Sequence, residues 1–140
     1  MESYNYIQVL ANIYLSNNPK INKDLIQMKL ITAVIFINYN DKSDPIDGHI
    51  NIINISISEN IDFNITNDLI INTLKANNGI LIISKDNLIG FAIISAFIIN
   101  YLNLNYLEIL ALGKILKIDI SNSNYLNILY SYYLSKTNLI

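Results

Sequence analysis

The side chains that most often carry out chemistry in proteins are scarce in this chain. It contains one histidine, His49, and no cysteine. Thiolate nucleophiles, thiolate metal sites and disulfides are therefore absent from the sequence. A Ser/His/Asp triad or a histidine metal site would depend on His49 alone. Because His49 follows Gly48 in a polar loop, we interpret it as a solvated turn residue.

Three aspartates in the same loop resemble a calcium site only superficially. Asp41, Asp44 and Asp47 are spaced by three beside a glycine. An EF-hand loop takes oxygen ligands from positions one, three, five and twelve, with glutamate at twelve. Counted from Asp41, position five is Pro45 and position twelve is Ile52, so the pattern fails. Aspartate and glycine favour turns for backbone reasons, and we interpret this segment as a turn without a metal ion.

Other catalytic patterns are also missing from the sequence. The four glycines are isolated and form no phosphate-binding G-x-G or G-K-[ST] motif. The eleven acidic residues are scattered singly, whereas paired carboxylates for acid–base catalysis must share one cleft. From these residues we expect a protein that is not an enzyme and needs no cofactor.

Charge and hydropathy limit the class of partner. The net charge is −2 and all nine basic residues are lysine, which argues against a nucleic-acid partner because phosphates require clustered cations. The most apolar stretch, residues 88–102, is shorter than the roughly twenty residues that span a bilayer. We therefore expect no membrane span, and the absence of cysteine and of a secretory signal fits an intracellular protein.

Apolar periodicity predicts mostly helices, although isoleucine and asparagine, with 31 and 23 occurrences, make alternation common by chance. Residues 30–37 are apolar all round and fit either a buried helix or a central strand. Residues 50–65 fit either a short irregular helix, which we favour, or a hairpin at 51–65. The expected helices cover residues 3–16, 22–38, 66–76, 88–102 and 104–118, with a last one opening at Ser121 or Ser123. Thr66 is the expected N-cap of the third of these helices, and Ser84 or Asp86 that of the fourth.

The helix at 88–102 decides the predicted architecture. A helix that is apolar on all sides must be covered on all sides. Amphipathic helices are expected before and after it, so we predict an all-α single domain over residues 1–140. In this prediction about seven helices form a bundle around the central helix 88–102, and the alternative is an α+β fold with the hairpin at 51–65.

Two local segments resemble Bcl-2-like proteins, in particular their poxviral members. The first, Asn64-Ile65-Thr66-Asn67-Asp68-Leu69-Ile70-Ile71-Asn72-Thr73-Leu74 followed by Asn77-Asn78-Gly79, is similar to the fourth helix and turn of poxviral apoptosis inhibitors. The second, Asp86-Asn87-Leu88-Ile89-Gly90-Phe91-Ala92-Ile93-Ile94, is similar to the start of the family's central helix. Cellular members carry Asn-Trp-Gly-Arg there; Asn87 matches, Leu88 replaces the tryptophan, and the arginine is missing.

The resemblance implies an apolar groove that receives an amphipathic helix. The family's arginine pairs with an aspartate of the incoming BH3 helix, and Lys85 is the substitute that the resemblance suggests. The implied groove residues are Met28, Ile53, Ile57, Leu69, Ile70, Thr73, Lys85, Asn87, Gly90, Phe91 and Ile94.

On this resemblance we expect a viral inhibitor of host apoptosis that sequesters BH3 helices of pro-apoptotic host proteins. Two alternatives stay open: an inhibitor of innate immune signalling with the same fold, acting through an outer face, and a non-enzymatic assembly oligomer such as a homodimer. The expected location is the host cytoplasm, or the mitochondrial surface if a C-terminal anchor is missing from the sequence.

Overall fold

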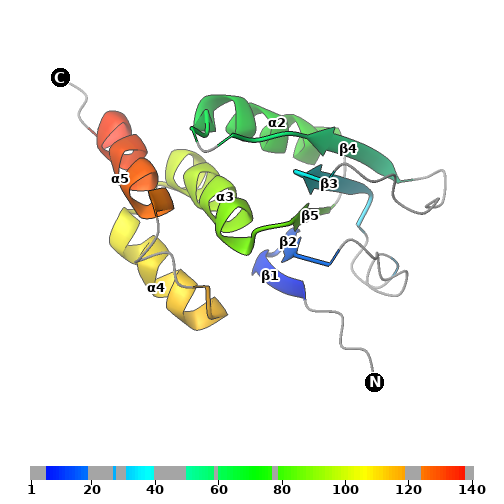
Figure 1. Ribbon diagram of the computed structural model, residues 1–140, viewed down its shortest axis with the longest axis horizontal. Helices are drawn as coiled ribbons and strands as arrows, with labels where there is room; N and C mark the ends of the chain where they lie inside the picture. The colour runs from blue at the N-terminus through cyan, green and yellow to red at the C-terminus, as the bar shows by residue number, and fades with distance from the viewer. Residues whose placement is uncertain are drawn as a thin grey trace.

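A five-stranded sheet and four helices make up the described part of the chain in the computed structural model (Figure 1). The structure describes residues 6–18, 27, 31–39, 50–58, 60–76, 79–118 and 124–137. The strands are β1 (Tyr6–Leu10), β2 (Ile13–Ser16), β3 (Ala33–Ile37), β4 (Asn51–Ile55) and β5 (Ile80–Ser84). The helices are α2 (Phe63–Ala76), α3 (Asn87–Leu102), α4 (Tyr106–Leu116) and α5 (Asn124–Thr137).

The sheet is mixed and has the strand order β1-β2-β5-β3-β4. Only β1 runs antiparallel to its neighbour, whereas β2, β5, β3 and β4 are parallel to one another. The all-α prediction is therefore wrong. The protein has an α/β fold in which the central strand, β5, is the last strand in the sequence.

The central strands are buried on both faces, which explains their unbroken apolar sequences. Every residue of β3 (AVIFI) and of β5 (ILIIS) is buried. Their alternate side chains enter two separate clusters: Ile35 and Ile82 face the helices, while Phe36 and Ile83 belong to the smaller cluster on the other face. Buried parallel strands are typically continuous runs of β-branched and other apolar residues.

Helix α3 confirms the predicted apolar helix but is covered differently from the prediction. Eleven of its sixteen residues are buried, and it contacts β2 and β5 on the sheet side and α2 and α5 on its other sides (Figure 1). A sheet and two flanking helices thus cover a helix that we expected only a bundle to cover. No helix in the described residues is long and apolar enough to cross a membrane.

The two N-terminal strands replace the helix that we predicted at residues 3–16. Tyr6–Leu10 and Ile13–Ser16 pair antiparallel. In the structure Ile7 and Val9, and then Ile13 and Leu15, occupy alternate positions that face the main core. Strand geometry turns successive side chains to opposite faces, and β-branched residues such as Ile7, Val9 and Ile13 pack well on a pleated surface.

The ambiguous segments resolve as parallel strands. Of the two alternatives for residues 30–37, the central strand is correct, and Ala33–Ile37 pairs with both β4 and β5. Asn51–Ile55 pairs parallel with β3, so the irregular helix at 50–65 and the hairpin at 51–65 are both wrong. The first part of the helix predicted at 22–38, residues 22–30, lies outside the described residues except for residue 27.

Helix α2 begins three residues before its predicted N-cap. Asp62 Oδ1 accepts hydrogen bonds from the backbone N–H groups of Asn64 and Ile65. Thr66 is buried one turn inside the helix, where its hydroxyl donates to the carbonyl of Phe63. The expected cap at Asp86 is correct, because Asp86 Oδ1 accepts from Leu88 N at the start of α3.

Helices α2 and α5 are joined by a partly buried polar contact. Asn67 Nδ2 donates to the phenol oxygen of Tyr132 over 2.7 Å, and the Phe63 ring lies edge-on to the Tyr132 ring at 5.2 Å. Asn67 is 2% exposed. Burial raises the pKa of Tyr132, and the hydrogen bond from Asn67 opposes that shift.

Gly90 sets the distance between α3 and the sheet, so we expect Gly90→Ala to destabilise the protein. An added Cβ would lie 2.6 Å from Leu15 Cδ1 and 2.9 Å from Ser84 Cβ. In an unobstructed helix the change would stabilise by ~1 kcal/mol; here we expect a loss of about 1–3 kcal/mol from overpacking. Chemical denaturation measures it, with Ala111→Gly on the exposed face of α4 as a control for helix propensity. A Gly90→Ala variant as stable as the wild type would contradict this reading of the contact.

Tyr132→Phe should lower the free energy of unfolding. It should also make that free energy depend less on pH in the alkaline range. Removing the phenol oxygen leaves Asn67 Nδ2 buried without an acceptor, which costs about 1–3 kcal/mol. Because folding raises the pKa of Tyr132, its contribution is complete below its unfolded pKa of about 10 and is lost as the pH rises above that value. Denaturation midpoints between pH 8 and 11 test this, with Tyr130→Phe as the control. Parallel curves for wild type and Tyr132→Phe would rule out the proposed linkage.

Candidate functional site

The carboxyl ends of four parallel strands meet at one edge of the sheet. The chain passes from β2 to β3, and from β4 through α2 back to β5, so β5 is inserted between strands that precede it in sequence. In open α/β sheets, ligands bind outside the carboxyl ends of the strands where the order of connection reverses. We call the part of this edge formed by residues 16–18, 37–39 and 84–87, at the ends of β2, β3 and β5, the carboxyl edge.

The connection from β5 to α3 lies at the centre of the carboxyl edge. Only Lys85 and Asp86 separate the end of the strand from the start of the helix. Lys85 N donates to the carbonyl of Ile37 at the end of β3. Ser84 is fully buried, and its hydroxyl donates to the carbonyl of Asp86 over 2.6 Å. The connection is therefore short and held by its own hydrogen bonds.

The amino terminus of α3 already holds a carboxylate. Asp86 Oδ1 accepts from Leu88 N over 2.8 Å, and the Asp86 carbonyl accepts from the N–H groups of Ile89 and Gly90. The first N–H groups of a helix, with the positive end of its dipole, form a favourable position for an anion. In this chain the anion at that position is the chain's own side chain.

A tyrosine bridges the two strands beside β5. The hydroxyl of Tyr39, after β3, donates to the carbonyl of Asn17, after β2, over 2.8 Å. A phenol is protonated at neutral pH at its ordinary pKa of about 10, and burial raises the pKa of Tyr39 further. This bond ties the ends of β2 and β3 together across β5.

Asn38 closes the other side of the carboxyl edge. Its backbone is left-handed, with φ of 62°, a conformation that asparagine tolerates better than most residues. Its N–H donates to the carbonyl of Ile55, and its Oδ1 accepts from Ile57 N over 2.7 Å. The chain leaving β4 is thus fixed beside the end of β3.

The residues predicted to line a groove do not form one set in the structure. Ile70, Phe91 and Ile94 are core residues with at most 1% exposure. Lys85 and Asn87 lie at the carboxyl edge, with Lys85 exposed. Met28 is outside the described residues. The others are placed as follows: Ile53 on β4, Ile57 after β4, Leu69 and Thr73 on α2, and Gly90 on α3 against the sheet.

Sequence reasoning missed Ser84, Asp86, Tyr39 and Asn38 as members of one site. The signal for the central pair was present: the apolar run Ile80–Ile83 follows Gly79 and is followed by Ser-Lys-Asp and a second apolar run. That pattern is typical of a buried strand, a turn and a helix. The neighbourhood of Tyr39 and Asn38 depends on strand order, which no local pattern indicates.

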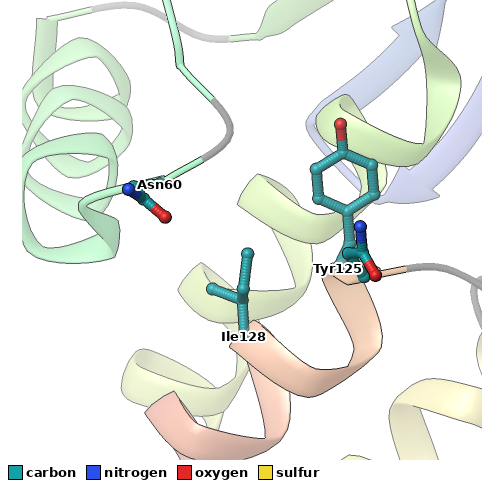
Figure 2. Close-up of a pocket in the computed structure, with 4 residues that line it drawn as sticks. Asn60, Tyr125 and Ile128 are labelled. Atoms are coloured by element: carbon teal, nitrogen blue, oxygen red, sulfur yellow. The ribbon is translucent and has the colours of Figure 1, made fainter.

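A small hollow lies between the segment before α2 and the first turns of α5. Asn60, Asn124, Tyr125 and Ile128 line it, with a volume of about 210 Å³ (Figure 2). Pockets for drug-sized ligands are usually about 300–1,000 Å³, so this one is small. Within the described residues, no group of three or more histidine, cysteine, aspartate or glutamate side chains is placed to hold a metal ion.

The sequence matches no family model and no curated protein, whereas solved structures match the fold closely. A human tyrosine phosphatase-like serine/threonine/tyrosine-interacting protein superposes with a TM-score of 0.73 at 16% identity, over 92% of this chain and 95% of that one. A mouse putative dual-specificity phosphatase, complexed with zinc tungstate, gives 0.77 at 10% identity over 96% and 89%. A leucine-rich-repeat and phosphatase domain protein from Entamoeba histolytica gives 0.71 at 19% identity over 95% and 94%.

These comparisons correct the identification made from sequence. The resemblance to poxviral Bcl-2-like proteins is wrong, and nothing supports inhibition of apoptosis or binding of BH3 helices. The expectation that the chain is not an enzyme is contradicted as well, because the fold is one that proteins described as phosphatases have. At identities of 10–19% the likeness establishes the fold: the chain is folded like the dual-specificity phosphatases.

Proposed function

We propose that this protein binds serine-, threonine- or tyrosine-bearing segments of a partner protein at the carboxyl edge, and that it prefers the free hydroxyl to the phosphorylated side chain. The phosphatase-like fold supports the location, since the carboxyl edge is the ligand-binding end of a sheet of this topology. The name of the human structural relative, a serine/threonine/tyrosine-interacting protein, supports the class of partner.

The observation that carries the proposal is the carboxylate of Asp86 at the amino terminus of α3. A phosphoryl group bound there would displace this carboxylate or lie beside it. Two unit charges about 4 Å apart interact by ~1 kcal/mol in water and ~4 kcal/mol near a protein surface. Lys85 offsets part of this repulsion at the carboxyl edge. A neutral hydroxyl meets no such repulsion and can donate a hydrogen bond to the carboxylate.

Asn87 adds a buried acceptor beside Asp86. Its Oδ1 is buried, and no group in the described part of the chain donates to it. A ligand hydroxyl would reach this oxygen only after the start of α3 moves, so the exposed carboxylate of Asp86 carries the preference for the unphosphorylated ligand.

A second candidate function is phosphoester hydrolysis with Ser84 as the nucleophile. Ser84 lies between a central strand and a helix, as the nucleophile does in the strand–turn–helix elbow of other hydrolases. Its side chain is fully buried and donates to the Asp86 carbonyl, so the loop would have to open before it could attack. The arrangement supports binding better than attack.

Asp86→Asn should reverse the preference between free and phosphorylated ligands. Asparagine caps helices as well as aspartate, so the variant removes the charge and keeps the cap. We expect the wild type to bind an immobilised library of Ser-, Thr- and Tyr-centred peptides better than the same library phosphorylated. Asp86→Asn should gain about tenfold for the phosphorylated peptides, which corresponds to ~1.4 kcal/mol.

Asp62→Asn is the matched control, because Asp62 caps α2 in the same way but lies outside the carboxyl edge. Its binding should equal that of the wild type. A wild type that binds neither library, or that prefers the phosphorylated one, would reject the proposal. Release of inorganic phosphate from the phosphorylated peptides that disappears in Ser84→Ala would replace it with the second candidate.

A further inference from the structure

The hydroxyl of Ser84 joins the sheet to the connection that carries Asp86. Ser84 is the last residue of β5, is fully buried, and donates to the carbonyl of Asp86 over 2.6 Å. Strand β5 lies at the centre of the sheet and pairs with β2 on one side and β3 on the other. A side chain on this strand is therefore a fixed point from which the exposed connection to α3 can be held.

The carbonyl of Asp86 also sets the start of α3. It accepts from Ile89 N over 3.1 Å and from Gly90 N over 3.3 Å. Among the described groups that donate to it, Ser84 makes the shortest bond and is the one that belongs to the sheet. Because the carbonyl and the carboxylate belong to the same residue, holding this peptide group also limits where the side chain of Asp86 can turn.

Gly90 leaves the space that the bond from Ser84 requires. A Cβ on Gly90 would lie 2.9 Å from Ser84 Cβ and 3.4 Å from Ser84 Oγ. Without a side chain at Gly90, the end of β5 and the first turn of α3 come close together. The serine hydroxyl can then reach the Asp86 carbonyl over a short distance.

The carboxylate of Asp86 has a defined direction although the residue is exposed. Its Oδ1 accepts from Leu88 N over 2.8 Å, and its backbone is extended, with φ of −112° and ψ of 115°. An exposed side chain can otherwise occupy several staggered rotamers. Groups that bind a ligand keep a productive geometry when neighbouring hydrogen bonds lock them in place, and Ser84 makes such a bond from within the sheet.

We infer that Ser84 is a positioning residue that holds the Asp86 carboxylate at the amino terminus of α3 and thereby sets the preference for the free hydroxyl over the phosphorylated side chain. This inference rests on the proposed function. Because Ser84 is fully buried, it acts through Asp86 and does not touch the ligand. Its hydroxyl keeps its proton in this role, whereas a nucleophile would give the proton up.

Ser84→Ala tests the inference because it removes only the hydroxyl oxygen. We expect the ratio of the dissociation constants for the phosphorylated and the free peptide libraries to fall about threefold to tenfold, since the hydrogen bond that holds the Asp86 peptide group is lost. A substitution that only loosened the fold would weaken binding of both libraries alike and leave this ratio unchanged.

Thr66→Val is the matched control for the loss of a buried hydroxyl. Thr66 is 2% exposed, and its hydroxyl also donates to a backbone carbonyl, that of Phe63 in α2. It lies outside the carboxyl edge, so the ratio of the two dissociation constants should equal that of the wild type. Circular dichroism confirms that each variant is folded.

A double-mutant cycle with Asp86→Asn shows whether Ser84 acts through Asp86. In the Asp86→Asn background, Ser84→Ala should change the ratio by less than about twofold, because the charge that Ser84 positions is gone. An unchanged ratio in Ser84→Ala alone would overturn the inference, and so would an equal fall of the ratio in both backgrounds.

Amide hydrogen exchange separates this inference from the proposed function, because it requires no ligand. The Leu88 amide, which donates to Asp86, should exchange several-fold faster in Ser84→Ala, whereas the Asn64 amide, which donates to Asp62, should not change. A wild type without preference between the libraries would reject the proposed function and with it the effect of Ser84 on that preference. Faster exchange of Leu88 would then still support the positioning of Asp86 by Ser84, and unchanged exchange would overturn it.

Discussion

The burial of α3 against β5 is the contact on which the rest of the structure depends. A helix that is apolar on nearly all sides cannot lie at a surface without exposing several apolar side chains. The sheet covers one side of α3, and α2 and α5 cover others. Gly90 lets the helix approach Ser84 and Leu15 closely. This approach fixes the position of the two-residue connection from β5 to α3 and hence the chemistry at the carboxyl edge.

The short connection limits what this edge can bind. With only Lys85 and Asp86 between strand and helix, the donors near the bend are already used: Leu88 N by the Asp86 carboxylate, and Ile89 N and Gly90 N by its carbonyl. The fold provides the electrostatic position that suits an oxyanion, and the sequence fills that position with a side chain. Fold likeness alone therefore does not determine the ligand, because the same architecture presents different groups when its central loop changes.

The sequence predicts the elements that local patterns determine, and it does not predict those that depend on residues far apart in the chain. Helix α3 and its Asp86 cap were correctly predicted, because a long apolar run after a capping residue is a local signal. Strands β1 and β2 were missed because apolar residues of several types in the segment 3–16 also recur at helical spacing, and β4 was missed because abundant isoleucine satisfies both a helical and a strand spacing. Ala33 pairs with Ile80 across almost fifty positions of sequence, and no periodicity indicates such a pairing. The carboxyl edge was missed for the same reason, since it joins residues 16–18, 37–39 and 84–87.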